Sequence, residues 1–318
     1  VLTVAGCGGG ALRRAETAHI RLTTDESSRY AQWFAMEMER TRNAFVDTLF
    51  QCADVGDADP LDVVAFREVD AFERYMAHRW DVDDVHGFVT TRPQRLVERP
   101  PALALRTRPS DALRLFRHEL THRLMARCTP QAPAWLDEGL AEVLETADVR
   151  DGTLHVGTPP YFFDDLGVDA ARIGGTVTEY VPRGALLTID ALRSLPRGGM
   201  IVASDRMATR ARYASAWALV AVLSTGPEDI KVAFAAYRRA LRTGASPGRA
   251  WTENLAPLPL DELYAHFIDS NDRWLVSYAV TVAADERTAV RVLSDRERDL
   301  FWARDLPWGT AEGREQAL

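Results

Sequence analysis

Two histidines four residues apart, His118 and His122, stand in the segment RHELTHRLMARC, with Glu119 directly after the first. On a helix, residues at i and i+4 lie about 40° apart around the axis, so both imidazoles can reach one metal ion. Glu119 would then reach a water molecule on that ion, where a carboxylate acts as a general base. This HExxH pattern predicts a zinc site; a surface helix with two solvated histidines is the other interpretation.

A catalytic zinc ion needs three protein ligands and one open position. The segment PAWLDEGLAEVLE, residues 133–145, offers the third ligand, because Glu138 and Glu142 share one face of a helix. A turn at residues 129–130 can fold this helix back against the first. We expect Glu138 to be the third ligand and Glu142 to accept a hydrogen bond from a ligand histidine. Two further acids are weaker candidates for a ligand: Asp137 and Glu145.

Two neutral imidazoles and one carboxylate would leave the ion with net positive charge, which lowers the pKa of a bound water to about 7 and polarises a carbonyl. Glu119 is then expected to take the proton of that water and pass it to the leaving amine. A catalytically silent zinc-containing binding protein and a non-peptide zinc hydrolase are alternatives. The intact Glu119 favours catalysis, because a binding module needs no base at that position.

Hydrophobic spacing predicts the elements that position these residues. The first hundred residues read as an α/β layer, with four strands and two helices; the strands are at 18–25, 61–67, 86–91 and 101–106, and the helices at 28–50 and 70–80. Pro109 opens the helix that carries HExxH. One apolar stripe of that helix consists of Leu113, Phe116, Leu120 and Leu124, and a neighbouring stripe of Leu115, His118, His122 and Met125. The histidines therefore lie beside the buried side.

The rest of the chain reads as mainly helical. Pro133 starts a helix that ends near Thr146, a hairpin is expected at residues 151–152, and further helices at 212–223, 230–244 and 260–269. The predicted fold class is α+β. We expect four parts: a lipobox and tether at 1–17, an N-terminal α/β layer at 18–109, the zinc-site helices and helical peptidase region at 110–270, and a C-terminal extension of unknown role at 271–318.

The run HELTH followed by PAWLDEGLAE resembles the gluzincin zinc metallopeptidases, specifically the peptidase MA-like family, whose motifs are HExxH and WxxEGxAE. The resemblance spans roughly residues 18–270. It implies a zincin-like fold, in which a mixed β-sheet and several helices pack around the HExxH helix, and a peptide or protein substrate. It also implies that His118, His122 and Glu138 bind zinc and that Glu119 is the general base.

Two later segments extend the resemblance. GALLTIDALRSL is similar to the family's segment after the site, and YASAWALVAVL is similar to its helix that begins with tyrosine. Tyr213 is thus implied as the donor to the oxygen that gains charge during attack, with Tyr180 and Tyr161 as competing donors. One departure is the spacing of fifteen residues between His122 and Glu138, which is shorter than in thermolysin-like or aminopeptidase-like gluzincins. It leaves the substrate class open.

The net charge of −8, from 46 acidic and 38 basic residues, disfavours a nucleic acid partner. No apolar run approaches the roughly eighteen residues of a membrane-spanning helix. The N-terminal VLTVAGCGGG resembles a bacterial lipobox with Cys7 as the lipidated residue, which predicts an extracytoplasmic lipoprotein anchored to the membrane only there. A plain Gly-rich terminal tail is the other interpretation. Cys52 and Cys128 are then an even pair for which a disulfide is permitted but not required.

The scattered histidines outside HExxH favour surface or core roles over metal binding, with His155 as the one remaining candidate.

Overall fold

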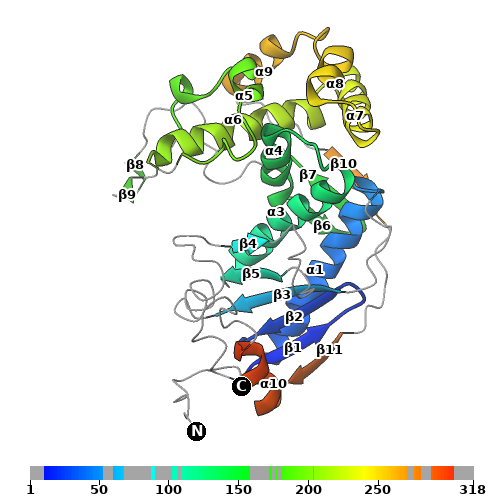
Figure 1. The fold of residues 1–318 in the computed structure, drawn as a ribbon, viewed down its shortest axis with the longest axis vertical. Helices are drawn as coiled ribbons and strands as arrows, with labels where there is room; N and C mark the ends of the chain where they lie inside the picture. The colour runs from blue at the N-terminus through cyan, green and yellow to red at the C-terminus, as the bar shows by residue number, and fades with distance from the viewer. Residues whose placement is uncertain are drawn as a thin grey trace, which may run out of the picture. The chain divides into compact units, whose positions relative to one another are not determined.

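The computed structural model describes residues 11–52, 60–67, 87–89, 102–106, 109–157, 172–173, 176–177, 181–202, 204–270, 276–280 and 288–303. These residues form helices and three β-sheets, which confirms the α+β class (Figure 1). They group into two compact units. The first comprises the described residues within 1–43, 55–119 and 282–318, and the second those within 44–54 and 120–281.

The first unit is built on a six-stranded mixed sheet in the order β11-β1-β2-β3-β5-β4. The strands are β1 (Arg13–Glu16), β2 (Ile20–Thr24), β3 (Leu61–Phe66), β4 (Gly87–Val89), β5 (Ala102–Arg106) and β11 (Ala289–Val292). The pairs β2–β3 and β3–β5 are parallel, whereas β1–β2, β1–β11 and β4–β5 are antiparallel. The predicted strands at 18–25, 61–67, 86–91 and 101–106 are thus confirmed, with shorter bounds. The predicted helix at 70–80 lies outside the described residues.

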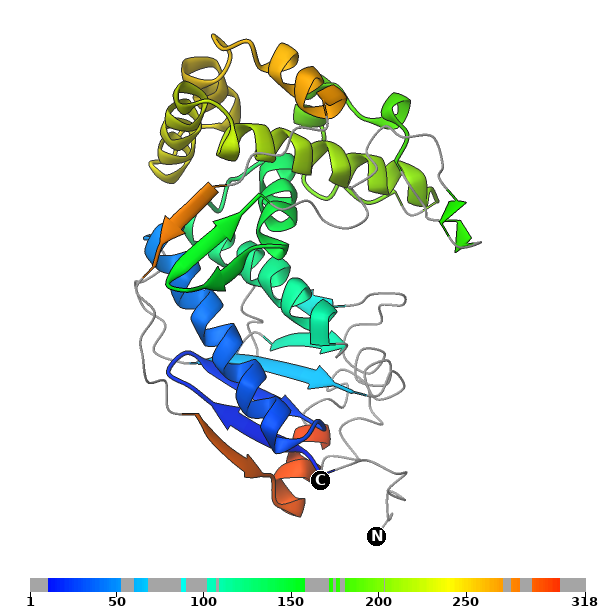
Figure 2. The same ribbon diagram turned by 180° about the vertical axis from the view of Figure 1, so that it is seen from behind.

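Helix α1 (Ser28–Thr48) runs across one face of this sheet (Figure 2). Its apolar positions recur at helical spacing, and the side chains of Phe34, Ala35 and Met38 are fully buried. Glu39 is also fully buried, and its carboxylate accepts hydrogen bonds from the Thr17 hydroxyl and from the backbone N–H and ring of His19. These bonds fasten the β1–β2 turn to α1.

Helix α3 (Pro109–Cys128) continues from the first unit into the second without a break, and α4 (Ala134–Glu145) follows after five residues. Both begin and end close to the positions that the prolines predict. The expected hairpin joins β6 (Asp148–Arg150) and β7 (Thr153–Val156), and its turn residues Asp151 and Gly152 both have positive φ. This is the backbone of the turn type that suits tight hairpins. Strand β10 (Val276–Ala279) pairs with β7.

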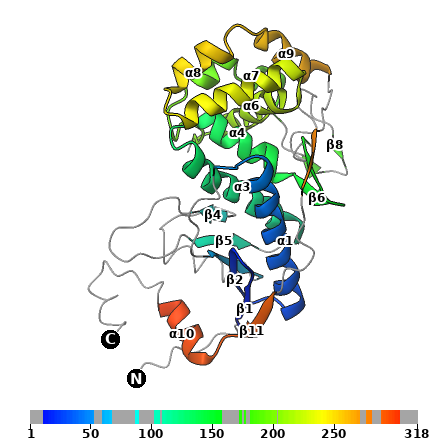
Figure 3. The same ribbon diagram turned by 90° about the vertical axis from the view of Figure 1, so that its right-hand side faces the viewer.

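The remaining helices are α5 (Ile189–Arg193), α6 (Arg206–Thr225), α7 (Glu228–Arg242), α8 (Pro247–Asn254) and α9 (Leu260–Ser270). This region also holds the short helix η1 (Arg183–Ala185) and the strands β8 (Arg172–Ile173) and β9 (Thr176–Val177). Helix α6 is the centre of this region, because it contacts α4, α5, α7 and α9 (Figure 3). Its side chains from Ala214 to Leu223 are almost entirely shielded from solvent. Within the described residues, no helix has both the length and the apolar composition needed to cross a bilayer.

Sequence patterns did not indicate several elements of the structure. The segment 271–318 was expected to be an extension without a readable role, yet β10 joins the sheet of β6 and β7, and β11 joins β1. Helix α10 (Asp295–Ala303) follows β11. Strand β1 and helix α8 were likewise not expected. Both late strands pair with strands much earlier in the sequence. In the first unit, β11 pairs with β1, so residues 289–292 lie beside residues 13–16.

Candidate metal centre

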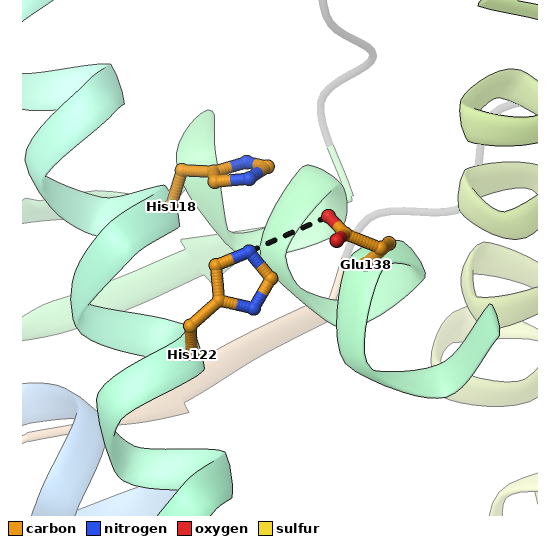
Figure 4. Close-up of side chains that lie close together, drawn as sticks. All are labelled: His118, His122 and Glu138. Carbon is orange, nitrogen blue, oxygen red and sulfur yellow. Dashed lines mark ion pairs between the residues drawn. The ribbon is translucent and has the colours of Figure 1, made fainter. Parts of the chain in front are cut away.

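The imidazoles of His118 and His122 and the carboxylate of Glu138 lie together in the structure (Figure 4). Each offers one ligand atom, and these three atoms lie within 4.8 Å of one another. The two histidines stand on successive turns of α3, and Glu138 stands in the second turn of α4. The structure therefore brings together the three side chains that the sequence singles out as ligands.

Packing of α3 fixes which way the histidines point. Phe116, Leu120 and Leu124 are almost fully buried, as the predicted apolar stripe requires, and Met125 is buried as well. His118 and His122 lie on the flank of this stripe and keep partial exposure. Their position at the border of the core lets them face α4 on one side and solvent on the other.

The turn between α3 and α4 is held by several hydrogen bonds. The Thr129 N–H donates to the Met125 carbonyl at 2.7 Å, and the Ala132 N–H donates to the Thr129 carbonyl at 2.9 Å. The Arg197 guanidinium donates to the Pro130 carbonyl. Pro133 then stands at the N-cap of α4 with extended backbone. These contacts set the angle at which α4 returns, and so they place Glu138 opposite His122.

His122 lies between two carboxylates. Its Nδ1 is 3.1 Å from Asp137 Oδ1, and its Nε2 is 3.4 Å from Glu138 Oε2. Nδ1 can donate to Asp137, which fixes the ring orientation and turns Nε2 toward Glu138. Asp137 was predicted only as a weaker candidate ligand. In the structure, Asp137 Oδ1 lies where it can accept a hydrogen bond from His122 Nδ1, and its role as a ligand stays a prediction.

The same two carboxylates determine the charge of His122. Burial is the largest single influence and lowers the pKa of His122, but the hydrogen bonds and charges of Asp137 and Glu138 outweigh it. The pKa of His122 therefore lies well above its ordinary value. A raised pKa favours the protonated imidazole, so a proton and a metal ion would compete for His122.

Glu142 and Glu145 form a second group with His118. One ligand atom of each residue lies within 4.8 Å of those of the other two, and both glutamates are more than nine-tenths buried. Glu142 is thus near His118, as its expected role as a hydrogen-bond acceptor of a ligand histidine requires. Glu145 lies about one turn further along α4, on the same side.

The residues fit a zinc ion. Tetrahedral zinc with ligand distances of about 2.1 Å has ligand atoms about 3.4 Å apart. The distance between His122 Nε2 and Glu138 Oε2 is 3.4 Å, which matches this separation. Two imidazoles and one carboxylate are also a ligand set typical of catalytic zinc. The side chains of His122 and Glu138 keep 15% and 21% of their exposure, whereas the Glu138 Oε2 atom is itself buried.

The other predicted residues have varied outcomes. Glu119 follows His118 on α3 and is partly exposed, and Tyr213 lies in α6 and is also partly exposed. The catalytic roles of both stay predictions. The lipidation site Cys7 and the competing donors Tyr161 and Tyr180 lie outside the described residues. His155 stands on β7, and its Nδ1 is 3.0 Å from Ser277 Oγ on β10. This exposed pair is not part of the candidate metal group, which consists of His118, His122 and Glu138.

Cys52 and Cys128 form a disulfide with a Cα–Cα distance of 5.5 Å. The sequence alone permits this pairing without requiring it. Cys128 is the last residue of α3, so the bond fastens the end of the helix that carries both histidines. The sequence contains three cysteines, and two remain for a disulfide once Cys7 is assigned to lipidation.

The chain matches no model of a known protein family, and a search of curated proteins found no similar sequence. The resemblance to the gluzincin peptidases stays a prediction.

Proposed function

We propose that this protein is a zinc-dependent peptidase of the gluzincin type, with a zincin-like fold, that hydrolyses peptide or protein substrates. The observation that supports this most is the placement of His122, whose Nε2 faces Glu138 while its Nδ1 faces Asp137. His118 completes the group. The mixed sheet and the HExxH helix in an α+β fold agree with this proposal, as does Glu119 directly after His118.

In this proposal, each residue near the metal has a separate task. His118, His122 and Glu138 would hold zinc, which would supply the positive charge that polarises a substrate carbonyl and lowers the pKa of water to about 7. Glu119 takes a proton from the attacking water and delivers it to the leaving amine. Asp137 keeps the His122 ring in the orientation that presents Nε2. Glu142, one turn further along α4, does the same for His118.

Tyr213 is the proposed donor to the substrate oxygen that gains negative charge as water attacks. A phenol placed close to that oxygen strengthens its hydrogen bond as the charge develops, which stabilises the transition state more than the ground state. Helix α6 carries Tyr213 and packs directly against α4, which carries Glu138. This contact supports a role for α6 beside the metal group.

An extracytoplasmic location is part of the proposal, with a lipid anchor at Cys7. The disulfide between Cys52 and Cys128 supports it, because disulfides persist mainly in oxidising compartments. The acidic net charge of −8 favours no nucleic acid partner. The anchor can be tested by Cys7→Ser in the membrane-targeted form, which should move the protein from the membrane fraction to the soluble fraction.

The function is tested by incubating the purified protein with a peptide library and identifying the products by mass spectrometry. We expect cleavage that a chelator abolishes and that added zinc restores. The matched control is Glu119→Gln, which keeps the shape of the side chain but removes the base. This variant should retain zinc and lose cleavage. Zinc binding without cleavage of any peptide by the parent protein would instead indicate a silent binding protein or a hydrolase of other substrates.

A further inference from the structure

The disulfide between Cys52 and Cys128 joins two segments that are far apart in the sequence, with a separation of 76 residues. Cys128 ends α3, six residues after His122, and only 7% of it is exposed. Cys52 lies four residues beyond the end of α1 and is exposed. The bond therefore joins one buried cysteine in the metal-bearing helix to one cysteine that solvent can reach.

The segment before Cys52 is itself anchored. The Arg238 guanidinium on α7 donates to the Leu49 carbonyl at 2.9 Å and lies 5.6 Å from the centre of the Phe50 ring. Phe50 is fully buried. Cys52 therefore extends from a fixed point in the second unit, and through it the disulfide holds the end of α3 to that point.

The end of α3 matters to the metal centre because the turn to α4 starts there. Thr129 directly follows Cys128, and its N–H and carbonyl make the two backbone hydrogen bonds that shape the turn. The geometry between His122 on α3 and Asp137 and Glu138 on α4 depends on that turn. If the last turn of α3 frays, α4 gains freedom to move relative to the histidines.

We propose that the Cys52–Cys128 disulfide is a redox-sensitive brace of the metal centre: when it is intact the centre binds zinc tightly, and when it is reduced zinc affinity falls. This inference rests on the zinc site of the proposed function and adds its regulation. It is supported by the position of Cys128 in the metal-bearing helix and by the exposure of Cys52.

The reductant in this proposal is a dithiol. One of its thiolates attacks the sulfur of Cys52, the more exposed of the two cysteines, and the S–S bond breaks so that Cys128 leaves as a thiolate and takes up a proton. The second thiol of the reductant, as thiolate, attacks the mixed disulfide and releases Cys52, which is also protonated. The reductant becomes a cyclic disulfide, and two electrons pass to the protein.

The test compares the oxidised protein with Cys52→Ala/Cys128→Ala, which lacks the bond and leaves no thiol at these positions to bind zinc. Zinc dissociation constants are measured by competition with a chelating dye, well below the unfolding temperature of both proteins. We expect the constant to rise about tenfold or more, the range seen when groups that orient metal ligands are lost. Adding a phosphine reductant should weaken binding by the parent protein and leave the double variant unchanged.

A second readout needs no metal. Amide hydrogen exchange of Thr129 and Ala132 in the zinc-free protein should accelerate when the disulfide is removed, because these amides make the hydrogen bonds of the turn. Zinc affinity that agrees within about twofold between the oxidised parent and the double variant would overturn the brace while leaving the zinc site intact. If the oxidised parent binds no zinc at all, both the proposed function and the brace fail.

Discussion

His122 on α3 lies beside two neighbouring carboxylates of α4. Both of its ring nitrogens face carboxylates, Asp137 at 3.1 Å and Glu138 at 3.4 Å, and together they raise its pKa despite burial. An imidazole oriented by one carboxylate and facing another already has the geometry of a ligand. A metal ion bound at Nε2 would therefore require little movement of this ring.

Asp137→Ala should weaken zinc binding about 10- to 100-fold, because the His122 ring loses the acceptor that fixes its orientation. Asp137→Asn should lose less zinc affinity, since the amide oxygen can still accept a hydrogen bond from His122 Nδ1. Zinc competition titrations measure both. Asp190→Ala is a matched control, because it removes the same charge from an exposed side chain outside the group. Affinity of Asp137→Ala equal to that of this control would remove Asp137 from the site.

Tyr213→Phe should lower kcat by about 10² or more, while KM and zinc content change little, because only a hydrogen bond made in the transition state is lost. Steady-state kinetics on a cleaved peptide, with zinc measured in the same preparation, separate these effects. Activity within a few-fold of the parent would move the role to another donor, and Tyr180→Phe is then the next variant to measure.

The sequence was sufficient to predict that His118, His122 and Glu138 lie together. Helix geometry places both histidines on one face, and the turn at residues 129–130 together with the gluzincin resemblance indicated Glu138. The sequence was not sufficient to predict the contact between Asp137 and His122. Residues 137 and 138 differ by about 100° around α4, so a helix that turns Glu138 toward the metal was expected to turn Asp137 away. The two ring nitrogens of His122 also point in different directions, and this lets neighbouring acids of one helix contact the same imidazole.

At the scale of elements, the contact between α4 and α6 brings the helix of the proposed oxyanion donor against the helix that carries Glu138. Gly139 makes this contact possible. A Cβ built on it would overlap the Ala216 carbonyl oxygen and lie 2.7 Å from a methyl group of Val220. Gly139 directly follows Glu138. A shift of α6 at this point would therefore also move the proposed zinc ligand Glu138.

Gly139→Ala should destabilise the protein by about 1–3 kcal/mol, the usual cost of forcing an extra carbon into a packed core. Gly248→Ala is the matched control, because Gly248 is also helical but its added Cβ would meet nothing within 4 Å. The control should be neutral or gain up to about 1 kcal/mol from helix propensity. Urea unfolding of both variants measures the difference, and equal stability would refute the close contact.

Long helices were predictable because their apolar spacing is sustained over many residues, as in α1, α3 and α6. Some short strands were not predictable, and β1 is an example. Strand β1 contains Arg13, Arg14 and Glu16 among its four residues, so no apolar alternation marks it. Its identity as a strand comes from pairing with β2 and with β11, which lies near the other end of the chain.

At the scale of the whole molecule, buried polar contacts fasten parts of the chain that the hydrophobic pattern leaves unspecified. Glu39 is the clearest example. Burial by itself would raise its pKa, but the hydrogen bonds from Thr17 and His19 outweigh burial and hold the pKa below its ordinary value. The ionised carboxylate is therefore favoured by folding, and it links α1 to the turn between β1 and β2.

This link makes stability depend on pH in a defined direction. Because the folded-state pKa of Glu39 is lowered, its contribution is fully present above about pH 4.3, the ordinary value for a glutamate, and is lost as the pH falls through the lower folded-state value. Glu39→Gln should cost about 1–3 kcal/mol at neutral pH and remove that part of the acid dependence. Urea unfolding at neutral pH and at a pH below the ordinary glutamate value measures both. A constant difference between parent and variant at all pH values would contradict this.

The arrangement of the whole chain was the least predictable from sequence. An even pair of cysteines permits a disulfide, but whether Cys52 meets Cys128 depends on how the end of α1 and the end of α3 are folded. The return of β11 to the first sheet depends likewise on tertiary structure. Local patterns thus specified the helices and the candidate ligands, and contacts distant in sequence specified how they are joined.

The central claim is that His118, His122 and Glu138 hold one zinc ion, and zinc content per chain after dialysis tests it most directly. We expect about one zinc in the parent protein and very little in His122→Ala or Glu138→Ala, because losing one of three ligands removes much of the affinity. Glu142→Ala should lose only part of its zinc, and the exposed control Glu253→Ala should lose none. Full zinc occupancy in Glu138→Ala would contradict the assignment.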